Sequence, residues 1–105
     1  MSLNIKKSFD KATNKWCVGL NGEVDIYTAS SLKESFIKML EEHKESVEID
    51  ADKLEYIDST GLGVLIGILK RLKKEEKDVT IRNAKPNIRK LFKITGLDKI
   101  FIIEE

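Results

Sequence analysis

Hydrophobic and polar residues follow two different periods along this chain. Alternation of apolar and polar positions indicates a strand with one buried face, whereas apolar positions that recur every three to four residues indicate an amphipathic helix. Strands are predicted at residues 3–9, 15–20, 47–51, 78–82 and 99–103, with a further apolar stretch at 54–57. Helices are predicted at residues 28–42, 62–72 and 86–95.

Polar segments, proline and glycine mark the limits of these elements. Residues 10–14 form a polar turn, so the first two strands are expected to make a hairpin, and Asn21-Gly22 is expected to end the second strand. Thr28 is a candidate N-cap for the first helix, because its hydroxyl can accept from an otherwise unpaired backbone N–H. Pro86 suits the first turn of the last helix, and Gly96 suits its C-terminal end.

The resulting order of elements, β-β-α-β-α-β-α-β, predicts an α/β fold. Strands that alternate with helices are expected to be parallel neighbours joined by right-handed crossovers. The N-terminal hairpin adds one antiparallel pair, so the sheet is expected to be mixed. No repeat, low-complexity segment or linker interrupts the sequence, and we therefore expect a single domain over residues 1–105.

The composition argues against several classes of function. The chain has 105 residues, 41% of them hydrophobic, and its 19 Lys and Arg balance 18 Asp and Glu to a net charge of +1. A balanced surface gives no electrostatic reason to bind nucleic acid or an anionic membrane. The longest apolar run, residues 62–69, is far short of the roughly 20 residues that cross a bilayer. With one cysteine and no apolar signal-peptide core at the N-terminus, the protein is expected to be cytoplasmic.

Cys17 and His43 are single residues of their types. One cysteine cannot form an intramolecular disulfide or a cysteine metal cluster, and one histidine argues against a histidine metal site or a Ser-His-Asp site. Cys17 is expected to pack in a strand, His43 to be solvated at a helix end, and Trp16 to lie in the core or on a face of the sheet. We therefore expect no metal, no cofactor and no catalytic residue.

The segment from Tyr56 to Gly63 carries the most informative local signal, because a strand ends, a serine follows and a helix begins. In one interpretation Asp58 or Ser59 is only the N-cap, and Gly61 and Gly63 let the helix lie close to the sheet. In the other, Ser59 is a phosphorylation site. The unpaired N–H groups and about half a positive charge at a helix N-terminus would stabilise a phosphate there.

The sequence Asp-Ser-Thr-Gly-Leu-Gly at residues 58–63 resembles the phosphorylation motif of bacterial anti-sigma factor antagonists, the stand-alone STAS domains. Upstream, residues 20–25 are similar to the Gly-Glu-Leu-Asp motif of this family, with valine in place of leucine. Residues 79–83 and 91–97 resemble its closing elements. Together these resemblances cover nearly the whole chain, which is identified as a member of the family.

The resemblance implies a regulator that works by exchanging partners. The unmodified protein would bind an anti-sigma factor that is also a serine kinase, and so free a sigma factor for transcription. The kinase, with ATP and magnesium, would phosphorylate Ser59 and dissociate, and a PP2C-type serine phosphatase would reset the cycle. Asp25 matches the family's aspartate beside the acceptor serine, in a loop where burial is not expected. The other supporting residues implied are Asp58, Thr60, Gly61, Leu62 and Gly63, with Thr60 a less favoured acceptor.

Two other classes of function compete with this one. The chain could be a STAS adaptor subunit of a stress-signalling scaffold or of a membrane transporter complex, without a dedicated kinase. The intact acceptor serine favours the regulator. A small enzyme would need a base near Ser59, and neither His43 nor a lysine in the motif is placed to act as one. The pair Gly63 and Gly67 is explained by close packing of the helix on the sheet.

Overall fold

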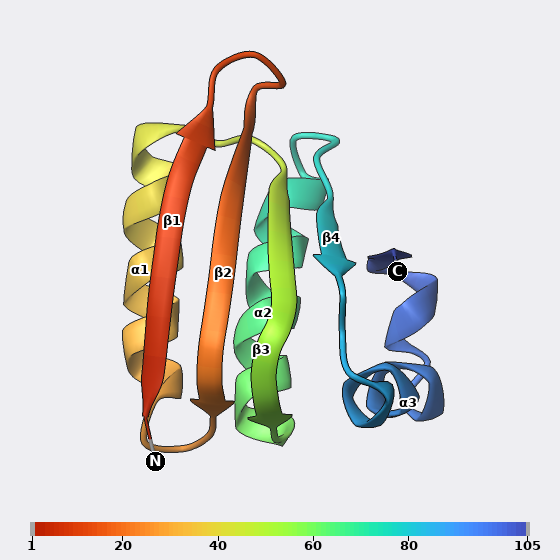
Figure 1. Cartoon of the computed structure of the whole chain (residues 1–105). Coiled ribbons are helices and arrows are strands. Elements are labelled where there is room, and N and C mark those ends of the chain that lie inside the picture. Colours follow the sequence, from red (N-terminus) through yellow and green to blue (C-terminus); the bar gives the residue numbers. More distant parts are fainter. Residues whose placement is uncertain (1, 105) are drawn as a thin grey trace.

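The computed structural model describes residues 2–104 of the chain. Within this range five strands and three α-helices alternate in the predicted order, with a 3₁₀-helix before the last strand (Figure 1). The strands are β1 (Leu3–Asp10), β2 (Lys15–Val24), β3 (Val47–Ile57), β4 (Val79–Arg82) and β5 (Ile102–Glu104). The helices are α1 (Ala29–Glu42), α2 (Ser59–Lys73), α3 (Pro86–Ile94) and the 3₁₀-helix η1 (Leu97–Lys99).

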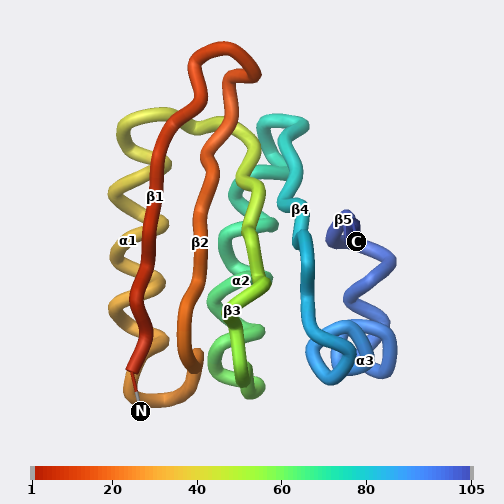
Figure 2. The backbone as a smooth tube through the Cα atoms, in the orientation of Figure 1, coloured from red at the N-terminus to blue at the C-terminus, as the bar shows by residue number. Residues whose placement is uncertain are grey.

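The strands form one mixed sheet in the order β1-β2-β3-β4-β5. The strands β1 and β2 are antiparallel, and the other neighbours are parallel. Because each parallel strand is added on the same side of the one before it, right-handed crossovers place their helices on one face of the sheet. Figures 1 and 2 show α1 and α2 behind the sheet, while α3 lies beyond the end of β4. The predicted α/β fold with a mixed sheet is confirmed.

The core fills the space between the sheet and helices α1 and α2. Alternate residues of β2 and of the first half of β3 point into it. The helices α1 and α2 each turn an apolar stripe towards the same space. The buried set includes Val18, Leu20, Leu32, Phe36, Met39, Ile49, Leu54, Leu65, Leu69 and Leu72. The predicted apolar faces of the first two helices are therefore confirmed.

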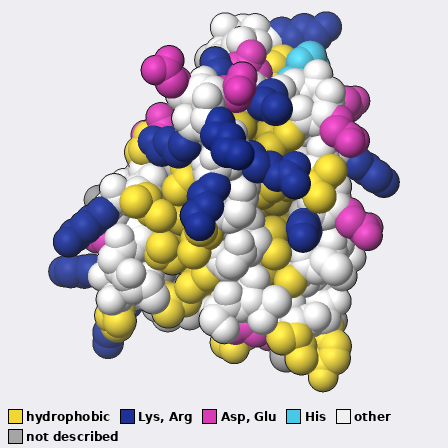
Figure 3. Space-filling model, turned by 180° about the vertical axis from the view of Figure 1, so that it is seen from behind, with side chains coloured by type: hydrophobic (Ala, Val, Ile, Leu, Met, Phe, Trp, Pro, Cys, Tyr) yellow, Lys and Arg dark blue, Asp and Glu magenta, His cyan; other side chains and the backbone are white. Residues whose placement is uncertain are grey.

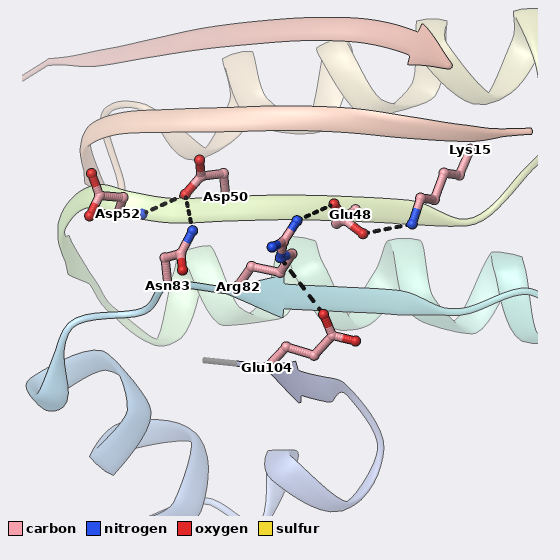
Figure 4. Close-up of polar contacts among 7 residues, drawn as sticks. All are labelled: Lys15, Glu48, Asp50, Asp52, Arg82, Asn83 and Glu104. Carbon is pink, nitrogen blue, oxygen red and sulfur yellow. Dashed lines mark hydrogen bonds and ion pairs between the residues drawn. The ribbon is translucent and has the colours of Figure 1, made fainter. Parts of the chain in front are cut away.

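The opposite face of the sheet carries a row of ion pairs (Figure 4). Glu48 on β3 accepts hydrogen bonds from Lys15 Nζ on β2 (2.7 Å) and from Arg82 Nη1 on β4 (3.0 Å). Arg82 also pairs with Glu104 on β5, at 3.7 Å between Nε and Oε1. The Lys15 hydrogen bond, with help from Arg82, lowers the pKa of the Glu48 carboxyl. Cys17 lies half-buried on this same face.

The strand β2 is longer than predicted. It continues through Asn21 and Gly22 to Val24, so the prediction that Asn21-Gly22 ends the strand is wrong. Gly22 takes a φ of +121°, and a Cβ there would lie 2.2 Å from the carbonyl oxygen of Ser2. Glycine thus lets β2 shift its register against β3 and still run on beside the start of β1. The two predicted stretches 47–51 and 54–57 likewise join into one strand, β3.

The C-terminal strand begins later than predicted. Lys99, the predicted first residue, belongs to η1, and β5 starts at Ile102. Gly96 ends α3 as predicted, with a φ of +75°. The chain then makes a 3₁₀ turn, which positions Phe101 edge-to-face against Phe92 of α3, with 5.4 Å between ring centroids. The turn thus places the Phe101 ring in a buried position against α3.

Trp16 is buried, as predicted, and closes one end of the core. Its indole Nε1 donates to the carbonyl oxygen of His43 at 2.8 Å. The residue His43 is exposed at the end of α1, as predicted, and its ring stacks on Phe9 with 3.8 Å between ring centroids. The His43 ring therefore packs against the end of the hairpin formed by β1 and β2.

Candidate functional site

The residues of the predicted site come from two segments at one end of the sheet: the loop after β2, and the start of α2 after β3. The strands β2 and β3 are parallel neighbours that pair up to Val24 and Ile57, so the segments that follow them start side by side. The backbone N–H of Asp58 donates to the carbonyl of Val24 (3.2 Å) and ties the start of α2 to the end of β2. The fold therefore brings residues 25–28 and 58–63 together.

Asp58 caps α2 and leaves Ser59 free. The Oδ1 atom of Asp58 accepts from the backbone N–H of Gly61 (3.1 Å), so Asp58 is the N-cap and Ser59 is the first residue of the helix. Ser59 is exposed, and its hydroxyl makes no hydrogen bond with any residue from 2 to 104. Thr60 is also exposed, whereas Leu62 is buried in the core. The described fold does not use the Ser59 hydroxyl.

Gly61 has the packing role predicted for it, but Gly63 does not. A Cβ on Gly61 would lie 2.5 Å from Cγ1 of Val24 and 2.7 Å from Cγ1 of Ile57. Gly61 therefore lets the first turn of α2 lie against β2 and β3. The same prediction for Gly63 and Gly67 is wrong, because both are exposed and a Cβ on either would meet no atom within 4 Å.

Asp25 is buried, contrary to the expectation for its loop. Only 4% of its surface is exposed, and its Oδ1 accepts from the backbone N–H groups of Tyr27 (2.9 Å) and Thr28 (3.1 Å). Thr28 is the N-cap residue of α1, as predicted, but its hydroxyl makes no capping hydrogen bond: it donates to the carbonyl of Glu23 (2.8 Å) and accepts from the backbone N–H of Asp25 (3.0 Å). The carboxylate takes up the N–H groups of the turn instead. Its second oxygen, Oδ2, is buried without a hydrogen-bond partner among residues 2–104.

Three large apolar side chains stand exposed around the two aspartates. The exposed fraction is 64% for Ile26, 75% for Tyr27 and 46% for Tyr56. Together with Asp25 and Asp58 they line a shallow hollow. Exposed apolar side chains of this size, next to polar groups, are typical of a surface that another protein covers. The sequence prediction missed them, although an Ile-Tyr pair between a strand and a helix was a signal for such a surface.

Among residues 2–104, no group of three or more His, Cys, Asp or Glu side chains could hold a metal ion. No helix in that range is long and apolar enough to cross a membrane. The geometry presents an exposed hydroxyl at a helix N-terminus, on the residue that follows Asp58, and Asp58 lines the hollow together with the exposed apolar side chains.

Comparisons with known proteins agree on one family. The sequence model of the STAS domain matches residues 6–105. The chain is 33% identical over 105 residues to an anti-sigma-B factor antagonist of Staphylococcus aureus, covering 100% of this chain and 95% of that protein. It is 36% identical over 88 residues to an anti-sigma-B factor antagonist of Staphylococcus epidermidis, covering 84% and 82%. The crystal structure of an anti-sigma factor antagonist from Mycobacterium paratuberculosis matches with a TM-score of 0.85 at 25% identity, over 98% of this chain and 86% of that one.

Proposed function

Because the chain belongs to the STAS domain family, we propose that it is an anti-sigma factor antagonist whose binding is switched off by phosphorylation of Ser59. In its unmodified form it binds an anti-sigma factor in the cytoplasm and so frees a sigma factor for transcription. The anti-sigma factor is itself the kinase, with bound ATP and magnesium. A PP2C-type serine phosphatase restores the hydroxyl.

The exposed Ser59 hydroxyl is the observation that carries this proposal. It stands at the first position of α2 and has no hydrogen-bond partner in the described chain. The first turn of a helix supplies N–H groups and a positive dipole end, and both stabilise a phosphate. A phosphate can therefore be added without breaking a contact of the fold.

The charge of the phosphate accounts for the loss of binding. A phosphoserine adds about 1.5 to 2 negative charges at pH 7. This charge would stand close to the exposed Ile26 and Tyr27, in a surface that the partner covers. Removing such a charge from water costs several kcal/mol unless the partner supplies cations. A partner shaped to fit the hydroxyl would therefore dissociate while the fold persists.

The neighbouring residues have different parts in the proposed switch. Asp58 and Gly61 fix the first turn of α2 and so position Ser59. Asp25 fixes the turn before α1 and so positions the exposed Ile26 and Tyr27. Leu62 anchors the helix in the core. Neither aspartate acts as a catalytic residue of this chain.

Phosphorylation by the cognate anti-sigma factor, followed by mass spectrometry, tests the acceptor. We expect a single phosphate on Ser59 and none on the Ser59→Ala variant. Four other serines in the described range are also exposed and serve as internal controls: Ser2, Ser8, Ser30 and Ser31. Phosphate confined to those residues or to Thr60 would contradict the assignment.

Calorimetric titration with the same anti-sigma factor tests the switch. We expect Ser59→Asp to bind about a hundredfold more weakly than the unaltered protein, a change of about 2.7 kcal/mol. Ser59→Ala, which adds no charge, should keep most of the affinity. Equal affinity of Ser59→Asp and the unaltered protein would instead favour an adaptor subunit that is not switched.

A further inference from the structure

We propose that the groove between α1 and α2 binds an acidic amphipathic helix of a partner protein. The groove lies on the helical side of the molecule, seen in Figure 3, and not on the sheet face with its ion pairs. It consists of two adjoining hollows that share Arg71, and it extends from Thr60, one residue after Ser59, along α2 to Glu75 just beyond the end of that helix. The inference rests on the proposed function only in taking the partner to be the same anti-sigma factor.

The floor of the groove is apolar. It is formed by Ile37 and Leu40 of α1 and by Val64 and Ile68 of α2. Ile37 and Val64 are half-buried, so parts of both side chains remain open to a ligand. A helix that lies in such a groove inserts apolar residues spaced three, four and seven positions apart.

Two glycines keep the α2 side of the groove low. Gly63 and Gly67 lie one turn apart on this side, and a Cβ on either would enter open space. Glycine inside a helix costs about 1 kcal/mol relative to alanine. The two residues therefore weaken α2 without relieving any contact in the described chain. Because neither residue has a side chain, another protein could approach α2 closely at these two positions.

The rim of the groove is basic. Lys33, Lys44, Arg71 and Lys74 are exposed, and none of them makes an ion pair within residues 2–104. Figure 3 shows Lys and Arg side chains gathered over the upper half of this face, with hydrophobic atoms between them. Two exposed glutamates also line the groove, which leaves its lining with a net charge of +2. An acidic helix is therefore the complementary occupant.

The position of the groove connects it to the proposed switch. Thr60 and Lys33 line the same end of it, so Ser59 stands at its entrance. A phosphate on Ser59 would add negative charge at that entrance and repel an acidic helix. The same modification would thus weaken both the contact around Ile26 and Tyr27 and the contact in the groove.

A designed peptide tests the groove without knowledge of the partner's sequence. The probe is a helix of about 18 residues with leucines on one face and glutamates beside them, and its control has lysine in place of every glutamate. We expect the acidic peptide to shift the NMR signals of Ile37, Val64 and Ile68, and the basic peptide to leave them unchanged. Equal effects of both peptides, or shifts confined to other faces, would overturn the inference.

Three variants sharpen this test. Gly67→Leu fills the groove and should preserve the fold, because leucine favours a helix more than glycine does. It should weaken the binding of the acidic peptide about tenfold or more, as expected when a contact at the centre of an interface is lost. The double charge reversal Arg71→Glu with Lys74→Glu should also weaken the binding of the acidic peptide. Lys90→Glu on α3, exposed and outside the groove, is the matched control and should have no effect.

Binding of the anti-sigma factor separates this inference from the proposed function. If Gly67→Leu binds it as tightly as the unaltered protein while Ser59→Asp does not, the groove inference is wrong and the proposed function stands. If both variants lose affinity, the groove is part of the interface. If the unaltered protein binds no anti-sigma factor but takes up the acidic peptide in the groove, the proposed function fails and the groove remains a docking site.

Discussion

Alanine substitution at three glycines of α2 gives a matched test of how this helix packs. The same change is made in one helix at Gly61, Gly63 and Gly67, so differences between the variants report the surroundings. In a helix interior the change stabilises by about 0.8 to 1 kcal/mol, and somewhat less in the first turn, where Gly61 lies. Only Gly61 faces the sheet.

At Gly61, the packing predicts that a new Cβ costs more free energy than the higher helix propensity of alanine provides. Its new Cβ would lie 2.5 and 2.7 Å from the Cγ1 atoms of Val24 and Ile57, about 1 Å closer than carbon atoms pack. Both neighbours are β-branched and almost fully buried, at 0% and 3% exposed, so they cannot rotate away. The helix must move off the sheet instead. Overpacking of this kind costs about 1 to 3 kcal/mol, so after a gain of about 0.5 kcal/mol the net loss is about 0.5 to 2.5 kcal/mol.

Urea unfolding measures these differences, followed by circular dichroism and by the fluorescence of Trp16, the single tryptophan. We expect Gly61→Ala to lower the free energy of unfolding by about 0.5 to 2.5 kcal/mol, or Tm by roughly 2 to 20 °C. Gly63→Ala and Gly67→Ala should each raise the free energy of unfolding by about 0.5 to 1 kcal/mol. If Gly61→Ala proves as stable as Gly63→Ala, α2 does not begin against β2 and β3 in the way described.

Three further predictions concern the loops and the open face of the sheet. Asp25→Ala should lower the free energy of unfolding by about 1 to 2 kcal/mol because two N–H groups lose their acceptor, and Asp25→Asn should cost less because its amide oxygen can still accept; equal losses in urea unfolding would contradict this. The pKa of Glu48 is lowered on folding, so its carboxylate stabilises the protein above its usual value of 4.5, and this contribution is lost as the pH falls through the folded pKa. Glu48→Gln should therefore be less stable than the unaltered protein at neutral pH, and the difference should shrink in urea titrations at acid pH. Ser59→Asp should keep its circular dichroism spectrum and its unfolding free energy within about 0.5 kcal/mol, and a larger loss would show that the hydroxyl matters for the fold.

The order of elements could be predicted because it is set by local periods. Residues 47–51 alternate as a half-buried strand must, and Leu62, Leu65, Leu69 and Leu72 mark one stripe of a helix. That stripe also held a signal that the prediction overlooked. Gly63 and Gly67 are each two positions from Leu65, which is about 200° around a helix, so they had to face away from the sheet.

The state of Asp25 could not be predicted from its neighbours in sequence. Asp25 and Thr28 are both good capping residues, and which one accepts the N–H groups depends on what else is within reach. The carbonyl of Glu23 takes the Thr28 hydroxyl only because β2 runs on past Gly22. The burial of Asp25 is thus a consequence of strand pairing. Its location beside Ser59 was implied by the family resemblance alone.

The hairpin that opens the sheet has a practical consequence for any binding experiment. Leu3 pairs with Gly22, and the carbonyl of Ser2 accepts from the backbone N–H of Glu23 (2.9 Å), so the beginning of β1 lies beside the loop that contains Asp25. The last strand, β5, lies at the opposite edge of the sheet from β1, as Figure 2 shows. The strand β5 ends two strands away from β3 and level with its residue Asp50, roughly 23 Å short of where β3 ends.

An affinity tag joined ahead of Ser2 would therefore occupy the space that a partner needs, whereas a tag after β5 would hang clear of it. A partner found only with carboxyl-terminal tags would be a partner of the Ser59 end of the molecule. One found equally well with both would contact another face. Comparing the two tagged forms thus locates an unknown partner's footprint before any residue has been mutated.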